Sequence, residues 1–259
     1  MDLELNGRVA VVTGASRGIG AAICAELARE GMDICLVARD ADAMRSVAAS
    51  LGNSVQTHVH TADLRDPDSA RAAIQAAVGT FGRIDLLVNN AGATKRADFF
   101  QLTDDDFLDG FALKYHGYVR MTREAWPHLR QTRGSIVNIV GVGARSGSAE
   151  FAIGGSVNAA ILNFTKAMAD IGIEQGVRVN AINPGLIATD RFIRNVERTM
   201  RERSLDRDAA ERFLLSNTKT ERVGRPDEIG TMTAFLASNK ADFVHGSLID
   251  VDGGWNRAL

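Results

Sequence analysis

The chain has 259 residues, of which 45% are hydrophobic, enough for the core of one large α/β domain. Its 30 Lys and Arg residues against 32 Asp and Glu residues give a net charge of -2, which argues against a nucleic-acid-binding or membrane-binding surface. The sequence opens without the basic and apolar segments of a signal peptide, and no apolar run approaches the roughly 18 residues of a membrane span. We therefore expect a soluble, cytoplasmic protein.

The first notable stretch of the chain joins a Val-rich strand to a helix through a glycine-rich turn. The turn reads Thr13-Gly14-Ala15-Ser16-Arg17-Gly18-Ile19-Gly20. Glycines allow backbone angles that side chains forbid, and a helix N-terminus directs free N–H groups and the positive end of its dipole at one point. The stretch is therefore typical of a phosphate-binding loop.

Strand-like and helix-like segments alternate through the rest of the chain. Apolar runs predict further strands at residues 32–37, 55–60, 85–89, 135–140, 177–182 and 247–251. Helical spacing predicts helices at residues 41–51, 67–81 and 107–129, with a long helix before the strand at 177–182. This order predicts one Rossmann-like domain over residues 1–259, a doubly wound parallel sheet of seven strands with helices on both faces. A ligand should bind at the carboxyl ends of the strands.

The two cysteines and one highly charged segment can be interpreted in terms of this fold. The two cysteines, Cys24 and Cys35, fall in a predicted helix and a predicted strand and are interpreted as core residues, with no metal site. The segment 191–212 is dense in charge with a thin apolar stripe, so it is either a solvated helical face or part of a helical lid over the ligand at about residues 188–220. We predict the lid. Pocket walls are expected at about 143–151 and 187–213, where arginines and Phe151, Phe192 and Phe213 suggest a ligand with apolar and anionic parts.

The glycine turn and several later motifs together resemble the short-chain dehydrogenase/reductase family over nearly the whole chain. The later motifs are Asp63, Asn89-Asn90-Ala91-Gly92, Pro184-Gly185, Arg225-Pro226 and Asp252-Gly253-Gly254. The resemblance implies a nicotinamide cofactor, a small-molecule substrate and a homodimer or homotetramer. The residues that it implies in cofactor binding are Gly14, Ser16, Arg17, Gly18, Ile19, Gly20, Asp63, Leu64, Asn90, Ala91, Gly92, Pro184, Gly185, Ile187 and Thr189.

The end of the second strand bears on which nicotinamide cofactor binds. An acidic residue there would accept a hydrogen bond from the ribose 2′-hydroxyl of NAD. The sequence instead reads Val37-Ala38-Arg39, and Arg39 and Arg17 are both suited to a 2′-phosphate. We predict a preference for NADP(H) over NAD(H), the alternative being that both arginines are solvated surface residues.

The usual catalytic residues of the family are replaced. The family uses a Tyr four residues before a Lys, a Ser upstream of them and an Asn on an earlier helix. The matching positions here are Gly154 for the Tyr, Asn158 for the Lys, Gly141 for the Ser and Lys114 for the Asn. Neither tyrosine of the chain, Tyr115 or Tyr118, has a lysine four residues later, so the pattern is absent in any alignment.

Several residues are candidate substitutes. Lys114 and Tyr118 are four residues apart and could form a relocated amine–phenol pair, unless Tyr118 packs in a subunit interface. Glu150, near Ser148 on a loop, could act as an acid or base or be solvated. Asn158 could bind a ribose hydroxyl, whereas His116 should point away from the site.

Three functions follow from these residues. The first is an atypical oxidoreductase that moves a hydride between NADP(H) and a carbonyl or alcohol by a non-standard proton route. The second is a lyase or isomerase on the same scaffold. The third is a non-catalytic nucleotide-binding module or partner subunit, because fold alone does not decide chemistry.

Overall fold

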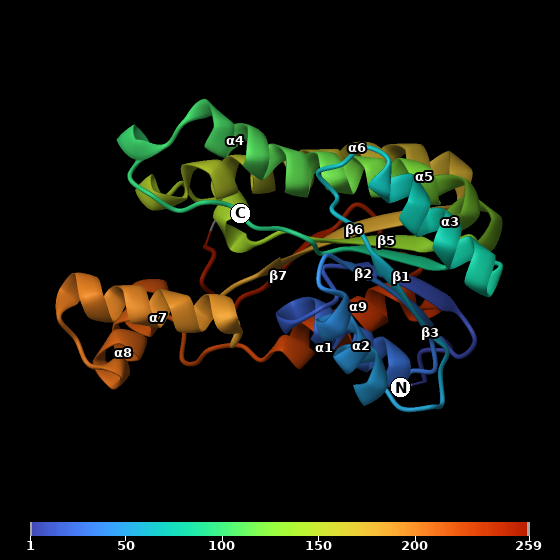
Figure 1. The fold of residues 1–259 in the computed structure, drawn as a ribbon, viewed down its shortest axis with the longest axis horizontal. Helices are drawn as coiled ribbons and strands as arrows, with labels where there is room; N and C mark the ends of the chain where they lie inside the picture. Colours follow the sequence, from blue (N-terminus) through green and yellow to red (C-terminus); the bar gives the residue numbers. More distant parts are fainter. Residues whose placement is uncertain (1, 258–259) are drawn as a thin grey trace.

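The computed structural model describes residues 2–257 and confirms the doubly wound fold. The described residues form a parallel sheet of seven strands in the order β3-β2-β1-β4-β5-β6-β7 (Figure 1). The strands are β1 (Val9–Thr13), β2 (Asp33–Ala38), β3 (Thr57–Thr61), β4 (Leu86–Asn89), β5 (Ser135–Ile139), β6 (Arg178–Pro184) and β7 (Leu248–Val251). The order reverses between β1 and β4, and ligands bind at such a reversal in open α/β sheets.

Helices cover both faces of the sheet, with α1, α2 and α9 on one face and α3, α5 and α6 on the other (Figure 1). Their bounds are α1 (Gly18–Arg29), α2 (Ala41–Ser50), α3 (Ser69–Phe81), α4 (Asp104–Gly110), α5 (Gly117–Thr132), α6 (Ala152–Gln175), α7 (Asp190–Arg203), α8 (Arg207–Thr218) and α9 (Pro226–Ala237). No helix among the described residues is long and apolar enough to cross a membrane.

The central strands are apolar because both of their faces are buried. Along β1, Ala10 and Val12 join the core under α1 and α9, while Val11 joins the core under α3 and α5. Cys24 and Cys35 are fully buried and unpaired in these two cores, which confirms their interpretation as core residues. The continuous apolar runs of the sequence therefore have the cause expected for a covered parallel sheet.

The helix predicted over residues 107–129 differs from the structure. It is divided into α4, a π-helical turn over Phe111–His116, and α5. The π-helical turn carries Lys114, and such turns are frequent at functional sites because they redirect side chains locally.

Helices α7 and α8 extend beyond the edge of the main body (Figure 1). They share a small core of their own around Phe192, Val196 and Ala210. The apolar stripe predicted in this segment is partly buried, with Val196 inside the small core and Ile193 40% exposed. The start of α7 follows β6, so it reaches the carboxyl end of the sheet, where a lid over the ligand would be placed.

Candidate active site

The glycine turn after β1 is built so that no side chain would fit at two of its positions. Gly14 has a φ of +66°, and a Cβ there would lie 2.9 Å from the side-chain nitrogen of Asn90. A Cβ at Gly20 would lie 2.2 Å from the carbonyl oxygen of Gly14. The backbone of the turn is therefore packed as closely as glycine allows.

Thr13 and Asn90 hold the turn against the end of β4. The Thr13 hydroxyl accepts hydrogen bonds from the backbone N–H groups of Asn90 and Ala91 at 2.9 and 3.1 Å. The Asn90 amide nitrogen donates to the carbonyl oxygens of Thr13 and Gly14 at 3.0 and 3.2 Å. These bonds explain why the Asn-Asn-Ala-Gly motif accompanies the glycine turn.

The N-terminus of α1 has no side-chain cap, so its first N–H groups and the helix dipole remain for a ligand. The helix begins beside a cleft of about 1070 Å³ at the carboxyl ends of the strands. All the residues predicted to bind the cofactor line this one cleft. An uncapped helix N-terminus, glycines where a Cβ would clash and a cleft of this size fit a dinucleotide.

The residues around the end of β2 favour a 2′-phosphate over a free 2′-hydroxyl. The first carboxylate after the strand, that of Asp40, accepts a hydrogen bond from Ala43 N–H at 3.0 Å and so caps α2. Arg39 lies 3.9 Å from Asp63, beyond hydrogen-bond distance, and its side chain is 63% exposed. Arg17 is similarly placed, 3.9 Å from Asp190. Both arginines line the cleft with donors left for an anion.

Lys114 and Asn158 meet in the wall of the cleft. The Lys114 Nζ donates to the side-chain oxygen of Asn158 and to the carbonyl oxygen of Val140, each at 2.8 Å. The Lys114 side chain is buried, and both residues line the cleft. These are the positions at which the family resemblance implies an Asn and a Lys, and the structure brings the two side chains into contact.

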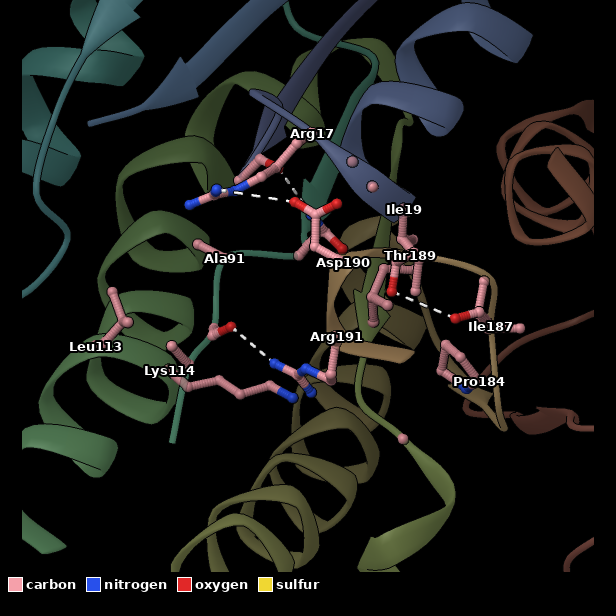
Figure 2. A pocket seen from close by; sticks show the side chains of 18 of the residues that line it. Arg17, Ile19, Ala91, Leu113, Lys114, Pro184, Ile187, Thr189, Asp190 and Arg191 are labelled. Atoms are coloured by element: carbon pink, nitrogen blue, oxygen red, sulfur yellow. Dashed lines mark hydrogen bonds and ion pairs between the residues drawn. The ribbon is translucent and has the colours of Figure 1, made fainter. Parts of the chain in front are cut away.

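The surroundings of Lys114 favour its neutral form. Burial, assisted by the positive charge of Arg191, lowers the pKa of the Lys114 amine from 10.5 to about 7. Figure 2 shows the side chains of Lys114 and Arg191 in the cleft, where the Arg191 guanidinium donates to the carbonyl oxygen of Gly92. An amine with a pKa near neutrality exchanges protons readily at physiological pH.

At the positions where the family resemblance implies a Ser and a Tyr, a side chain would meet backbone strain at one and a neighbouring ring at the other. Gly141 has a φ of +130°, a conformation that L side chains rarely adopt. A Cβ at Gly154 would lie 2.1 Å from the ring of Phe151. The Phe151 ring therefore occupies the space in front of Gly154, and it lines the cleft in place of a phenol.

The structure does not support Tyr118 as a partner that reaches the substrate. Its hydroxyl donates to the carbonyl oxygen of Ile139 at 2.8 Å, and its side chain is fully buried. Burial raises the pKa of this phenol, and Tyr118 does not line the cleft. Because Tyr118 is fully buried within a single chain, its side chain cannot pack in a subunit interface, and that alternative is wrong.

The remaining candidates lie at or outside the rim of the cleft. Glu150 forms a 2.7 Å ion pair with Arg198 and does not line the cleft, whereas Ser148 does. His116 is exposed, as expected.

Of the predicted aromatic walls, Phe151 and Phe192 line the cleft but Phe213 does not, because its ring packs under Arg203. Sequence reasoning missed Arg96, which lines the cleft from the segment after β4 and has no motif to mark it.

Comparison with known proteins identifies the family of this chain. A family model described as enoyl-(acyl carrier protein) reductase matches residues 14–256. The chain belongs to the short-chain dehydrogenase/reductase family.

Members of this family that resemble the chain include reductases of several kinds. An acetoacetyl-CoA reductase of Shinella zoogloeoides is 35% identical over 95% of this chain and 98% of its own length. The NADPH-dependent reductase BacG of Bacillus subtilis is 31% identical over 98% of this chain and 100% of its own length. The crystal structure of L-sorbose reductase from Gluconobacter frateurii, complexed with NADPH and L-sorbose, matches with a TM-score of 0.95 and 31% identity over 100% of both chains.

Proposed function

We propose that the protein is an NADP(H)-dependent oxidoreductase that interconverts a carbonyl and an alcohol, with Lys114 as its proton-transfer group. The observation that carries this proposal is the Lys114 amine itself, held by Asn158 and Val140 in the wall of the cleft with a pKa of about 7. The similar reductases that are named or crystallised with NADPH support the choice of cofactor.

The residues of the cleft fit the cofactor at both ends. When bound, NADPH supplies the hydride. The open N-terminus of α1 would hold the phosphates, and Arg39 and Arg17 would bind the 2′-phosphate. Pro184, Ile187 and Thr189 follow β6 and would hold the nicotinamide end, as the family resemblance implies.

The geometry of Lys114 suits a proton donor. A protonated amine has three N–H donors, and two of them are taken by the oxygens of Val140 and Asn158. The third remains for the oxygen of a carbonyl substrate. As that oxygen gains negative charge during reduction, the ammonium stabilises it and gives it a proton. In the oxidative direction the neutral amine accepts the proton of the alcohol.

The exchange of Lys and Asn changes which residue carries the proton. In the family pattern the Lys acts through a Tyr, lowering the pKa of its phenol. Here Phe151 fills the space in front of Gly154, and the phenol of Tyr118 is bonded to the backbone. Among the residues that line the cleft, Lys114 combines burial with a pKa lowered to about 7. A positioned acid of this kind typically contributes about 10²–10⁴-fold to a rate.

The test is NADPH oxidation, followed by absorbance over a panel of aldehydes, ketones and quinones. We expect turnover by the natural chain and a loss of about 10²-fold or more in Lys114→Met, with little change in NADPH affinity. Lys166→Met is the matched control, because Lys166 is exposed and does not line the cleft. Full activity in Lys114→Met would refute the assigned role. Tight NADPH binding without turnover across the panel would favour the non-catalytic alternative.

A further inference from the structure

Three arginines that line the cleft have no carboxylate partner. Arg96, Arg191 and Arg194 all line the cleft, and among residues 2–257 none of them forms an ion pair with an Asp or Glu. Other arginines of the region do have such partners: Arg198, for example, binds Glu150 at 2.7 Å. Uncompensated positive charges in a cleft attract an anion.

Arg191 lies next to the amine of Lys114. Its guanidinium donates to the carbonyl oxygen of Gly92 at 3.2 Å. The carbon chain of Lys114 packs on the same residue, so closely that a Cβ at Gly92 would lie 2.8 Å from the Lys114 Cδ. The positive charge of Arg191 is near enough to lower the pKa of Lys114 (Figure 2). A group bound by Arg191 would therefore adjoin the group that takes the proton.

Arg96 approaches the same space from the segment after β4. Its guanidinium stacks on the Phe151 ring, 4.2 Å from the ring centroid. The Arg96 side chain is exposed to the cleft, and partial burial together with the charges of Arg198 and Arg191 lowers its pKa, while Glu150 offsets only part of this effect. Partial burial and the charge of Arg194 also lower the pKa of Arg191, which is exposed to the cleft as well. The cluster is therefore one of mutually repelling cations, which an anion would relieve.

We propose that the substrate carries a carboxylate close to its reacting carbonyl, as in a 2-oxo acid, and that Arg191 and Arg96 bind this carboxylate. A guanidinium binds a carboxylate through two parallel N–H donors, which fixes the orientation of the substrate as well as its position. Phe151 provides an apolar surface beside the carboxylate site for the rest of the molecule.

This inference rests on the proposed function and gives it a balanced reaction. The carbon–oxygen π bond of the oxo acid breaks. Bound NADPH would supply the hydride for the new C–H bond, and Lys114 would supply the proton for the new O–H bond. The oxo acid is thereby reduced to a hydroxy acid and NADPH is oxidised to NADP⁺, while Lys114 recovers its proton from solvent.

The kinetic test compares acids with their neutral esters. The probes are pyruvate with methyl pyruvate and benzoylformate with methyl benzoylformate, each reduced with NADPH. We expect kcat/KM for the better acid to exceed that for its ester by about tenfold or more. Arg191→Gln should lower the ratio of kcat/KM for the acid to kcat/KM for the ester by about 10–100-fold. The ratio is the readout because loss of the Arg191 charge also raises the pKa of Lys114 and so changes the rate for both substrates. Arg96→Gln should act in the same direction, and Arg191→Lys should restore part of the loss.

Arg123→Gln is the matched control, because Arg123 is exposed on α5 and does not line the cleft. Equal values of kcat/KM for acid and ester, or equal losses on both in Arg191→Gln, would overturn the inference. A selective fall in NADPH affinity in Arg191→Gln would also overturn it, because the arginine would then serve a cofactor phosphate. Circular dichroism of each variant shows whether it is folded.

A binding experiment separates failure of this inference from failure of the proposed function. Benzoate and benzamide are titrated calorimetrically into the natural chain in the presence of NADP⁺. Tighter binding of benzoate, lost in Arg191→Gln and kept in Arg123→Gln, supports the carboxylate site even if no carbonyl compound is turned over. Benzoate binding no tighter than that of benzamide would overturn the site, whatever the outcome for turnover.

Discussion

The lowered pKa of Lys114 makes the stability of the fold depend on pH. A single substitution, Lys114→Met, removes this contribution and so allows it to be measured. In the unfolded chain this amine titrates near 10.5, and in the folded protein near 7. Between these values the unfolded chain holds one more proton than the folded protein, so the natural chain gains stability as the pH rises. The slope is about 1.4 kcal/mol per pH unit, because one pKa unit corresponds to that energy.

Lys114→Met removes this titration and keeps a side chain of similar length. Between about pH 6 and about pH 9, the natural chain should gain roughly 2.7 kcal/mol over the variant, from the two pH units above the folded pKa. The absolute difference at one pH is less informative, because Met leaves the oxygens of Val140 and Asn158 without their donor. Urea unfolding of the natural chain and of Lys114→Met, each without cofactor and at several pH values, measures the difference between their free energies of unfolding. A difference independent of pH would refute the burial argument for Lys114.

Three further substitutions test other parts of the site. Arg39→Gln should weaken NADPH binding by about tenfold or more and leave NADH binding nearly unchanged in a fluorescence titration, and equal effects on both would contradict the assignment of the 2′-phosphate. Gly20→Ala places a Cβ 2.2 Å from the oxygen of Gly14, so we expect a loss of about 1–3 kcal/mol in the free energy of unfolding and weaker NADPH binding. Gly154→Tyr should destabilise the fold by a similar amount because Phe151 occupies the space. Adding Phe151→Gly should recover part of that loss, and no recovery would show that the ring is not the obstacle.

The fold was largely predictable because its signals are local. Each strand of the sheet begins and ends within about two residues of an apolar run, and the glycine turn lies where a strand meets a helix. The interruption of the helix at Phe111–His116 could not be predicted, because a π-helical turn adds one residue without changing the apolar character of the segment. Helix α9 was not predicted at all, although Pro226 stands at its first position.

The cofactor-binding part of the site could be predicted from the sequence, whereas the contacts around Lys114 could not, and the difference has a physical cause. The cofactor-binding positions lie in short motifs at strand ends, which the sheet brings to one edge whatever the rest of the chain does. The contact between Lys114 and Asn158 depends instead on how two distant segments pack. The spacing of Lys114 and Tyr118 suggested a working pair, but spacing does not show that the phenol bonds to Ile139. The position of Phe151 over Gly154 is likewise a result of packing.

The role of Lys114 is tested most directly by the pH dependence of carbonyl reduction, measured for the natural chain and for Lys114→Met. If Lys114 donates the proton, kcat/KM for reduction should fall as the pH rises through about 7, where the amine loses its proton. The oxidative direction should show the opposite trend, and both trends should vanish in Lys114→Met together with most of the activity. A variant that keeps the activity and the pH profile of the natural chain would contradict the central claim.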